Sequence, residues 1–277
     1  MVKKLIFWTL AVVLTLSAAV YQRLTGPTYP KQVKVTIENL EIKGKFLRSG
    51  NTGENAIIVL SNIPESVSAT LFYKRYPTTE DFSPQPFERK GSNLEAFLPS
   101  QPAAGKLQYY VQVDNETSSI ELYKENPITI RFKGIVPAVI LIPHIIFIFF
   151  AMLFSSLAGI YAFQKMDGYK LYGWIALGLL TLGGFIFGPI VQYYAFGEAW
   201  TGFPFGYDLT DNKTLIAGVI WVGALLLNNK KDRPTYIALA AIALLLVFSI
   251  PHSLFGSELN YDSGKVITGM ILPLLGR

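Results

Sequence analysis

The chain has 277 residues, of which 51% are hydrophobic and 16% charged, against about 25% charged residues in an ordinary soluble domain. It carries a net charge of +5 and no cysteine, which excludes disulfides, thiolate metal sites, iron–sulfur clusters and cysteine nucleophiles. The basic residues are dispersed or lie in short loops beside apolar segments. The positions of these basic residues therefore predict membrane topology, and they argue against a nucleic-acid partner.

Residues 1–24 combine a positively charged start with an apolar run. Lys3 and Lys4 precede the apolar Leu5–Leu16, and Ser17-Ala18-Ala19 offers the small residues of a cleavage site. We predict a signal peptide or an uncleaved signal anchor, and the mediocre cleavage site favours the anchor. Either form predicts export of the chain that follows.

Residues 25–133 have the composition of a soluble domain, with short β-type runs separated by turn signals. The predicted strands are Val33–Ile37, Leu40–Ile42, Ala56–Leu60, Ala69–Tyr73, Leu94–Leu98, Leu107–Val113 and Ile128–Phe132. Turns are expected at Gly50-Asn51 and Ser83-Pro84 among others. Seven or eight short strands at this spacing predict an extracytoplasmic all-β sandwich.

The stretch LFYKRYPTTEDFSPQPFERKGSNLEAFLPSQPAAGKLQYYVQVDN contains an aromatic-basic strand, a short strand ending in Leu-Pro, a Pro/Gly turn and a Tyr-Tyr-Val strand. This pattern resembles immunoglobulin-like and fibronectin-like extracellular domains over Lys31–Lys133. The resemblance implies a sandwich with a recognition or spacing role, and it carries over no catalytic residue.

Residues 134–277 are predicted to form an all-α domain of four transmembrane helices. The helices are expected at about residues 137–163, 171–195, 209–228 and 234–252. The third apolar run, Leu215–Leu227, is too short to span a bilayer, so its helix must begin near Leu209. The short apolar stretch Val266–Leu275, broken by Pro273, is predicted to lie at the membrane interface.

Positive charges predict the orientation of these helices. They gather at Lys3-Lys4, at Lys165 with Lys170, and at Lys230, Lys231 and Arg233. By the positive-inside rule these ends are cytoplasmic, which puts the β domain, the loop 196–213 and the C-terminal tail outside. We expect a multi-pass protein of a bacterial-type cytoplasmic (inner) membrane, whose partners are the lipid bilayer and a membrane or extracytoplasmic protein.

The chain has two histidines, His144 and His252, near the outer ends of the first and fourth predicted membrane helices. Two neutral imidazoles on facing helices could bind one haem b or one transition-metal ion. Alternatively, His252 caps a helix or faces the headgroups, and His144 hydrogen-bonds to a neighbouring helix. No metal-binding motif surrounds either residue, so both interpretations stay open.

The most unusual segment is GEAWTGFPFGYDLTDNKTL, residues 197–215. Asp208 or Thr210 could cap the helix that follows, because oxygen side chains there satisfy free backbone N–H groups. In the alternative, Asp211 and Lys213 pair with each other or with a ligand. The candidate polar site on the outer face contains Glu198, Asp208, Asp211, Asn212, Lys213 and Glu258. The aromatic residues around it predict an interfacial belt, with a ligand cage as the alternative.

Gly184 and Gly188 have the GxxxG spacing that permits close helix approach, and we expect it to serve packing within the bundle. Walker A, G-x-S-x-G, H-E-x-x-H and dinucleotide-binding motifs are absent from the sequence. The sequence therefore predicts a non-enzymatic accessory or recognition component. The alternatives are a haem- or metal-binding redox module and a membrane-embedded enzyme or small-solute carrier.

Overall fold

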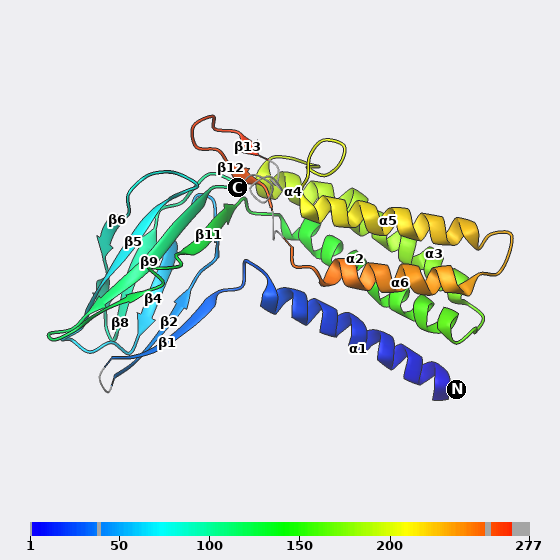
Figure 1. Ribbon diagram of the computed structural model, residues 1–277, viewed down its shortest axis with the longest axis horizontal. Helices are drawn as coiled ribbons and strands as arrows, with labels where there is room; N and C mark the ends of the chain where they lie inside the picture. The colour runs from blue at the N-terminus through cyan, green and yellow to red at the C-terminus, as the bar shows by residue number, and fades with distance from the viewer. Residues whose placement is uncertain (1, 38–39, 253–255, 268–277) are drawn as a thin grey trace. The chain divides into compact units, whose positions relative to one another are not determined.

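The computed structural model describes residues 2–37, 40–252 and 256–267, which form two compact units (Figure 1). The helical unit contains the chain up to Pro27 together with Val136–Gly256. The β unit contains Thr28–Ile135 together with Ser257–Ile267. The predicted order of an apolar N-terminal helix, a β-rich region and further apolar helices is confirmed.

Two larger sheets form the sandwich of the β unit. The first has the strand order β1 (Lys31–Ile37), β2 (Leu40–Phe46), β4 (Ala56–Ser61), β8 (Asn93–Leu98) and β7 (Glu88–Lys90). The second has the order β3 (Ser49–Asn51), β11 (Ile128–Lys133), β9 (Lys106–Asp114), β5 (Ser68–Tyr76) and β6 (Ser83–Pro86), and β10 (Ser119–Leu122) also pairs with β9. Apart from the parallel pair β3–β11, these strands pair antiparallel.

Alternating side chains build one apolar core from the two sheets. Ile58 and Leu60 of β4 and Leu107 and Val111 of β9 are fully buried and belong to the same cluster. The buried Tyr109 hydroxyl donates to the Leu47 carbonyl oxygen at 2.8 Å. Burial raises the pKa of Tyr109 well above its usual value, because the phenolate would lose its hydration. The β-sandwich predicted from the period-two pattern is thus present.

Each of the seven predicted strands lies within an observed strand. The predicted turns at Gly50-Asn51 and Ser83-Pro84 are wrong, because these residues lie in β3 and β6. Pro84 and Pro86 are tolerated there since β6 is an edge strand, where a missing N–H donor need not break a ladder.

After the last helix the chain returns to the β unit. A hairpin of β12 (Glu258–Leu259) and β13 (Val266–Ile267) is held by the Leu259 N–H, which donates to the Ala104 carbonyl at 3.1 Å. The Tyr261 hydroxyl accepts from the Lys106 N–H at 3.0 Å and donates to the Lys106 carbonyl at 2.9 Å. The interfacial tail was expected over Val266–Leu275; its first two residues belong to the β unit instead, and 268–275 lie outside the described residues.

The helical unit consists of α1 (Val2–Thr25), α2 (Ala138–Phe163), α3 (Tyr169–Leu180), η1 (Thr181–Phe187), α4 (Gly188–Phe196), α5 (Leu209–Leu227) and α6 (Pro234–Ser249). Within the described residues, four helices are long and apolar enough to cross a membrane, namely α1, α2, α5 and the continuous helix α3–η1–α4. The prediction that the α5 helix begins near Leu209 is confirmed. Helix α6 has 16 residues, or roughly 24 Å, less than the hydrocarbon core of about 30 Å.

Small residues bring the helices together. Helix α1 buries Ala11, Thr15 and Ala18 on one face. The Gln22 amide near its end donates to the carbonyl oxygen of Phe248 in α6 at 2.9 Å. A Cβ at Gly184 would lie 2.6 Å from the Thr214 side chain, so this glycine does serve close packing within the bundle. The N-terminal helix is therefore packed into the helical unit.

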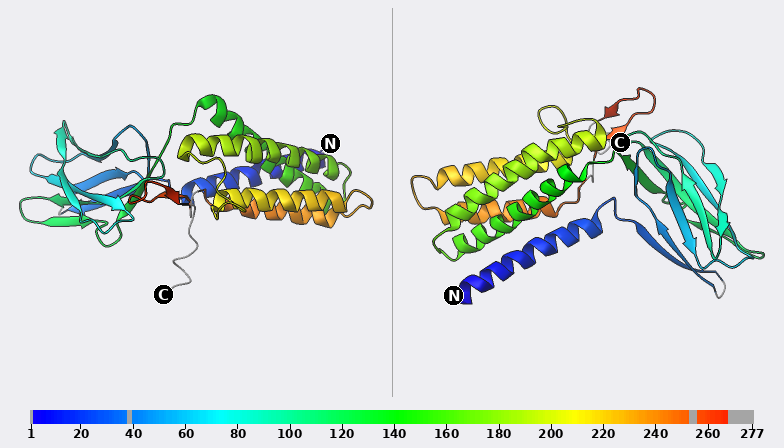
Figure 2. Two further views of the ribbon diagram at one scale, coloured as in Figure 1. Left: turned by 90° about the horizontal axis from the view of Figure 1, so that it is seen from above. Right: turned by 180° about the vertical axis from the view of Figure 1, so that it is seen from behind.

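The cationic segments meet at one end of the helical unit. The start of α1, the α2–α3 connection and the α5–α6 connection lie together in both views of Figure 2. An ion pair of 2.5 Å between Lys170 and Asp232 joins the two connections, and it lowers the pKa of Asp232. The loop 197–208 lies at the opposite end of the unit.

Candidate functional site

The loop 197–208 is folded back on itself between α4 and α5. Gly197 ends α4 in the left-handed conformation, with φ of 83°. The Trp200 indole N–H donates to the Phe203 carbonyl at 3.1 Å, and the Asp208 N–H donates to the Thr201 carbonyl at 3.0 Å. These hydrogen bonds lie within the loop and fix its shape independently of its contacts with the helices.

Asp211 fastens this loop to two helices. Its Oδ2 accepts from the Thr201 N–H at 2.6 Å, from the Thr201 hydroxyl at 3.1 Å and from the Gln192 amide at 3.0 Å. Asp211 lies on α5 and Gln192 on α4, so one buried carboxylate oxygen joins α4, the loop and α5. Three donors satisfy that oxygen, which makes Asp211 a structural acceptor.

The neighbours of Asp211 have the same role. The Asp208 carboxylate accepts from the Thr210 N–H at 2.8 Å, which confirms its prediction as the cap of α5. The Asn212 side-chain oxygen accepts from the Phe203 N–H at 2.8 Å. A Cβ at Gly202 would lie 2.6 Å from Asp211 Cβ, so the loop needs glycine there. We call Asp208, Asp211 and Asn212 the loop staple.

Lys213 is separate from the loop staple. Its side chain is buried, with the residue 3% exposed, and its Nζ donates to the Ile250 carbonyl at 2.6 Å, just beyond α6. No carboxylate of the described residues lies within the 4.0 Å of an ion pair with it. The alternative in which Asp211 and Lys213 pair with each other is not what the structure has, because each bonds to other partners.

His144 bonds to the π-helical segment η1. Its Nδ1 lies 2.9 Å from the Gly183 carbonyl oxygen. A carbonyl only accepts, so Nδ1 carries the proton and the lone pair lies on Nε2. This is the interhelical hydrogen bond that the sequence offered as one interpretation of His144.

His252 lies in the neighbourhood of Lys213 and His144. Although His252 keeps an exposed edge, the surrounding protein lowers its pKa, and the charges of Lys213 and His144 lower it further. We call these three residues the basic cluster. In the part of the chain that the structure describes, no three histidine or acidic side chains are grouped as metal ligands.

The two remaining predicted site residues are Glu198 and Glu258. Glu198 is exposed on the loop. Glu258 belongs to the β unit, where it pairs with Lys106 at 2.7 Å. The predicted polar site therefore divides into a loop staple, a basic cluster and two unrelated glutamates.

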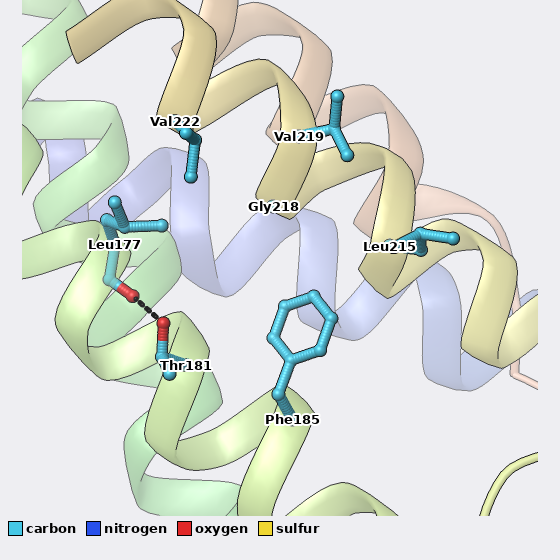
Figure 3. Close-up of a pocket in the computed structure, with 7 residues that line it drawn as sticks. All are labelled: Leu177, Thr181, Phe185, Leu215, Gly218, Val219 and Val222. Atoms are coloured by element: carbon cyan, nitrogen blue, oxygen red, sulfur yellow. Dashed lines mark hydrogen bonds between the residues drawn. The ribbon is translucent and has the colours of Figure 1, made fainter. Parts of the chain in front are cut away.

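The helical unit also carries an apolar groove between α3–η1 and α5 (Figure 3). It has a volume of about 290 Å³ and is lined by Leu177, Thr181, Phe185, Leu215, Gly218, Val219 and Val222. The Thr181 hydroxyl in its lining donates to the Leu177 carbonyl at 2.9 Å. The groove therefore offers apolar contact and no acid, base or metal ligand. The lining of the groove comes from two separate segments of the sequence, so no local sequence motif predicts the groove.

No protein-family model matches the chain, and a search of curated proteins finds no similar one.

Proposed function

We propose that this chain is a non-enzymatic recognition or accessory component of a membrane, which displays its β unit on the extracytoplasmic side. The observation that carries the proposal lies on the outer face of the first sheet. Among the described residues of Lys31–Lys133, the exposed large hydrophobic side chains are Ile57, at 51%, and Phe97, at 44%. They are opposite each other on β4 and β8, so they form one small apolar spot, which we propose as the contact site for a partner protein.

The strand order supports an immunoglobulin-like assignment for the β unit. In such sandwiches one sheet has the order A-B-E-D and the other contains C, F and G. The order β2-β4-β8-β7 corresponds to the first, and β11-β9-β5-β6 corresponds to G-F-C-C′. Many cell-surface domains share this architecture, and a recognition role would use the exposed pair of Ile57 and Phe97.

The loop staple supports a structural use of the acidic residues. Asp208 and Asp211 accept hydrogen bonds from backbone or side-chain donors that would otherwise be buried without partners. One oxygen of Asp211 already accepts from three donors of the protein, which favours a structural acceptor over a catalytic group. An enzyme or carrier built on these carboxylates is accordingly disfavoured.

Cysteine labelling tests the orientation of the chain. The natural chain has no cysteine, so single cysteines at the exposed Ser92, Glu198 and Asn229 report one position each. In intact cells, we expect an impermeant thiol reagent to label the first two and to leave Asn229→Cys unmodified until the membrane is opened. Gly202, in the same loop as Glu198, is unsuitable for a cysteine because its Cβ would lie 2.6 Å from Asp211 Cβ. Labelling of Asn229→Cys alone would reverse the proposed sidedness.

Photo-crosslinking tests the recognition surface. A photoreactive amino acid at Phe97 is expected to give a discrete cross-linked protein species in cells. The same group at Ser83, exposed on the edge strand β6 of the other sheet, is the matched control and should give at least fivefold less. The adduct at Phe97 should disappear when Ile57 is changed to lysine. Equal yields at both positions would contradict a contact site at this spot.

A second candidate function is binding of haem b or a transition-metal ion by His144 and His252. The observation in its favour is the His144 Nδ1 bond to the Gly183 carbonyl, since metal-ligating histidines usually donate their other ring N–H in this way. Protein purified in detergent from haem-replete cells would then show a Soret band or a stoichiometric metal, lost in His144→Ala. A colourless and metal-free preparation would reject this candidate.

A further inference from the structure

We propose that the outer face of the first sheet pairs with the same face of a second copy of this chain, about a two-fold axis that runs along the strands between β4 and β8. The inference rests on the proposed function, because its centre is the apolar spot of Ile57 and Phe97, and it names the partner of that spot. The arrangement of charge around the spot selects a second copy.

The residues of this face lie in rows across the strands. One row contains, in the order of the strands β2, β4, β8 and β7, the residues Lys45, Val59, Glu95 and Glu88. Neighbouring strands are about 4.8 Å apart, so Lys45 and Glu88 are separated by roughly 14 Å and their midpoint falls between β4 and β8. Ile57 and Phe97 face each other across the same two strands. The apolar pair and the charged pair therefore have the same midline.

A two-fold axis along this midline makes the face self-complementary. The rotation exchanges β4 with β8 and β2 with β7, so Ile57 of one copy faces Phe97 of the other, and Lys45 of one copy faces Glu88 of the other. Each contact occurs twice, as in any isologous interface. An axis across the strands would instead leave β2 facing β2, and Lys45 would meet the lysine of the other copy.

Lys45 and Glu88 are the charges of this face that lack an ion pair. Both residues are exposed, and within the described residues neither has an oppositely charged partner within 4.0 Å. The neighbouring charges are paired within their own chain, Glu41 with Lys34 at 2.8 Å and with Lys43 at 3.3 Å, and Lys90 with Glu95 at 2.8 Å. The rotation places Lys43 near Lys90 of the other copy, but each of these lysines keeps its own carboxylate. One charge of each sign is thus left for a contact between copies.

The same axis suits two copies in one membrane. Because it is parallel to the strands, the strands of both copies run in the same direction, and the chain enters both β units at the same end. Four of the five strands have six or seven residues, which gives a face of roughly 500 Å² per copy. The two copies would bury on the order of 1,000 Å², the lower limit of a specific interface. We therefore expect a reversible dimer, favoured by the high effective concentration of copies held in one membrane.

The experiment uses the full chain in membranes, expressed as two copies with different tags. A photoreactive amino acid at Phe97 is expected to give an adduct of twice the mass of the chain that carries both tags. An adduct of this chain with a different protein would overturn the second copy as partner and leave the proposed function standing. The absence of any adduct would contradict both.

Charge exchange decides whether Lys45 and Glu88 meet across the interface. In Lys45→Glu alone, or in Glu88→Lys alone, both contacts join like charges, and the yield of the two-copy adduct should fall at least fivefold. When one copy carries Lys45→Glu and the other Glu88→Lys, both contacts again join opposite charges, and the mixed adduct should recover.

Lys133→Glu is the matched control, because it makes the same change at an exposed position of β11 in the other sheet. It should leave the yield of the two-copy adduct unchanged. The substituted positions are exposed, so the variants are expected to fold. An undiminished yield in both single variants, or no recovery in the mixed pair, would overturn the proposal.

Discussion

Replacing Asp211 by alanine is expected to lower the free energy of unfolding of the helical unit by about 3 kcal/mol, because three donors then lose a charged acceptor in a buried place. The donors are the N–H and hydroxyl of Thr201 and the Gln192 amide. Asp211→Asn keeps one acceptor oxygen and should lose about half as much. Thermal unfolding in detergent, followed by tryptophan fluorescence, measures both variants.

The matched control for this prediction is Asp167→Ala, which removes an exposed aspartate at the other end of the helical unit. It should change stability by less than about 0.5 kcal/mol, as surface substitutions usually do. The loop 197–208 should also become more sensitive to protease in Asp211→Ala, since its fastening to α4 and α5 is lost. If Asp211→Ala were as stable and as protected as the control, the role of Asp211 in the loop staple would be refuted.

Gly159→Ala is expected to destabilise the contact between α2 and α6 by about 1–3 kcal/mol, the usual cost of overpacking. A Cβ at Gly159 would lie 2.5 Å from the Cβ of Ala241, and neither atom can rotate away. The helices would have to separate or shift along each other. The measurement is again the unfolding midpoint in detergent, together with the yield of folded protein.

Gly178→Ala provides the control for the same chemical change in a helix of the same unit. A Cβ at Gly178 meets no heavy atom within 4 Å, so the change should be neutral or stabilising by up to about 1 kcal/mol through helix propensity. Equal destabilisation by both alanines would show that helix packing at Gly159 is looser than the structure indicates.

The fold was largely predictable because its signals are local. Period-two alternation located the strands that build the core, such as Leu107–Val113 within β9. The length needed to span a bilayer placed the start of α5 at Leu209. Strands β3 and β6 were not predicted, because Gly50 and Pro84 normally mark turns. The pairing of these strands with β11 and β5 also depends on residues distant in sequence.

The site was less predictable because its contacts are not local. The cap formed by Asp208 follows from its position before α5, and it could be anticipated. The partners of Asp211 lie 10 and 19 residues earlier, at spacings that match no motif. Glu258 was grouped with the outer-face residues by its place after the last helix, whereas its actual partner is Lys106 of the β unit.

Because Ser257–Ile267 belongs to the β unit, the helices between Ile135 and Ser257 begin and end at the same unit. The chain leaves that unit at Ile135 and rejoins it at Ser257, so any membrane crossed by the helices in between is crossed an even number of times. Helices α2, α3–η1–α4 and α5 are long and apolar enough to cross, so if all three do, an even number requires that α6 crosses too, despite its 16 residues. A bilayer thinned around α6 would accommodate a helix of this length.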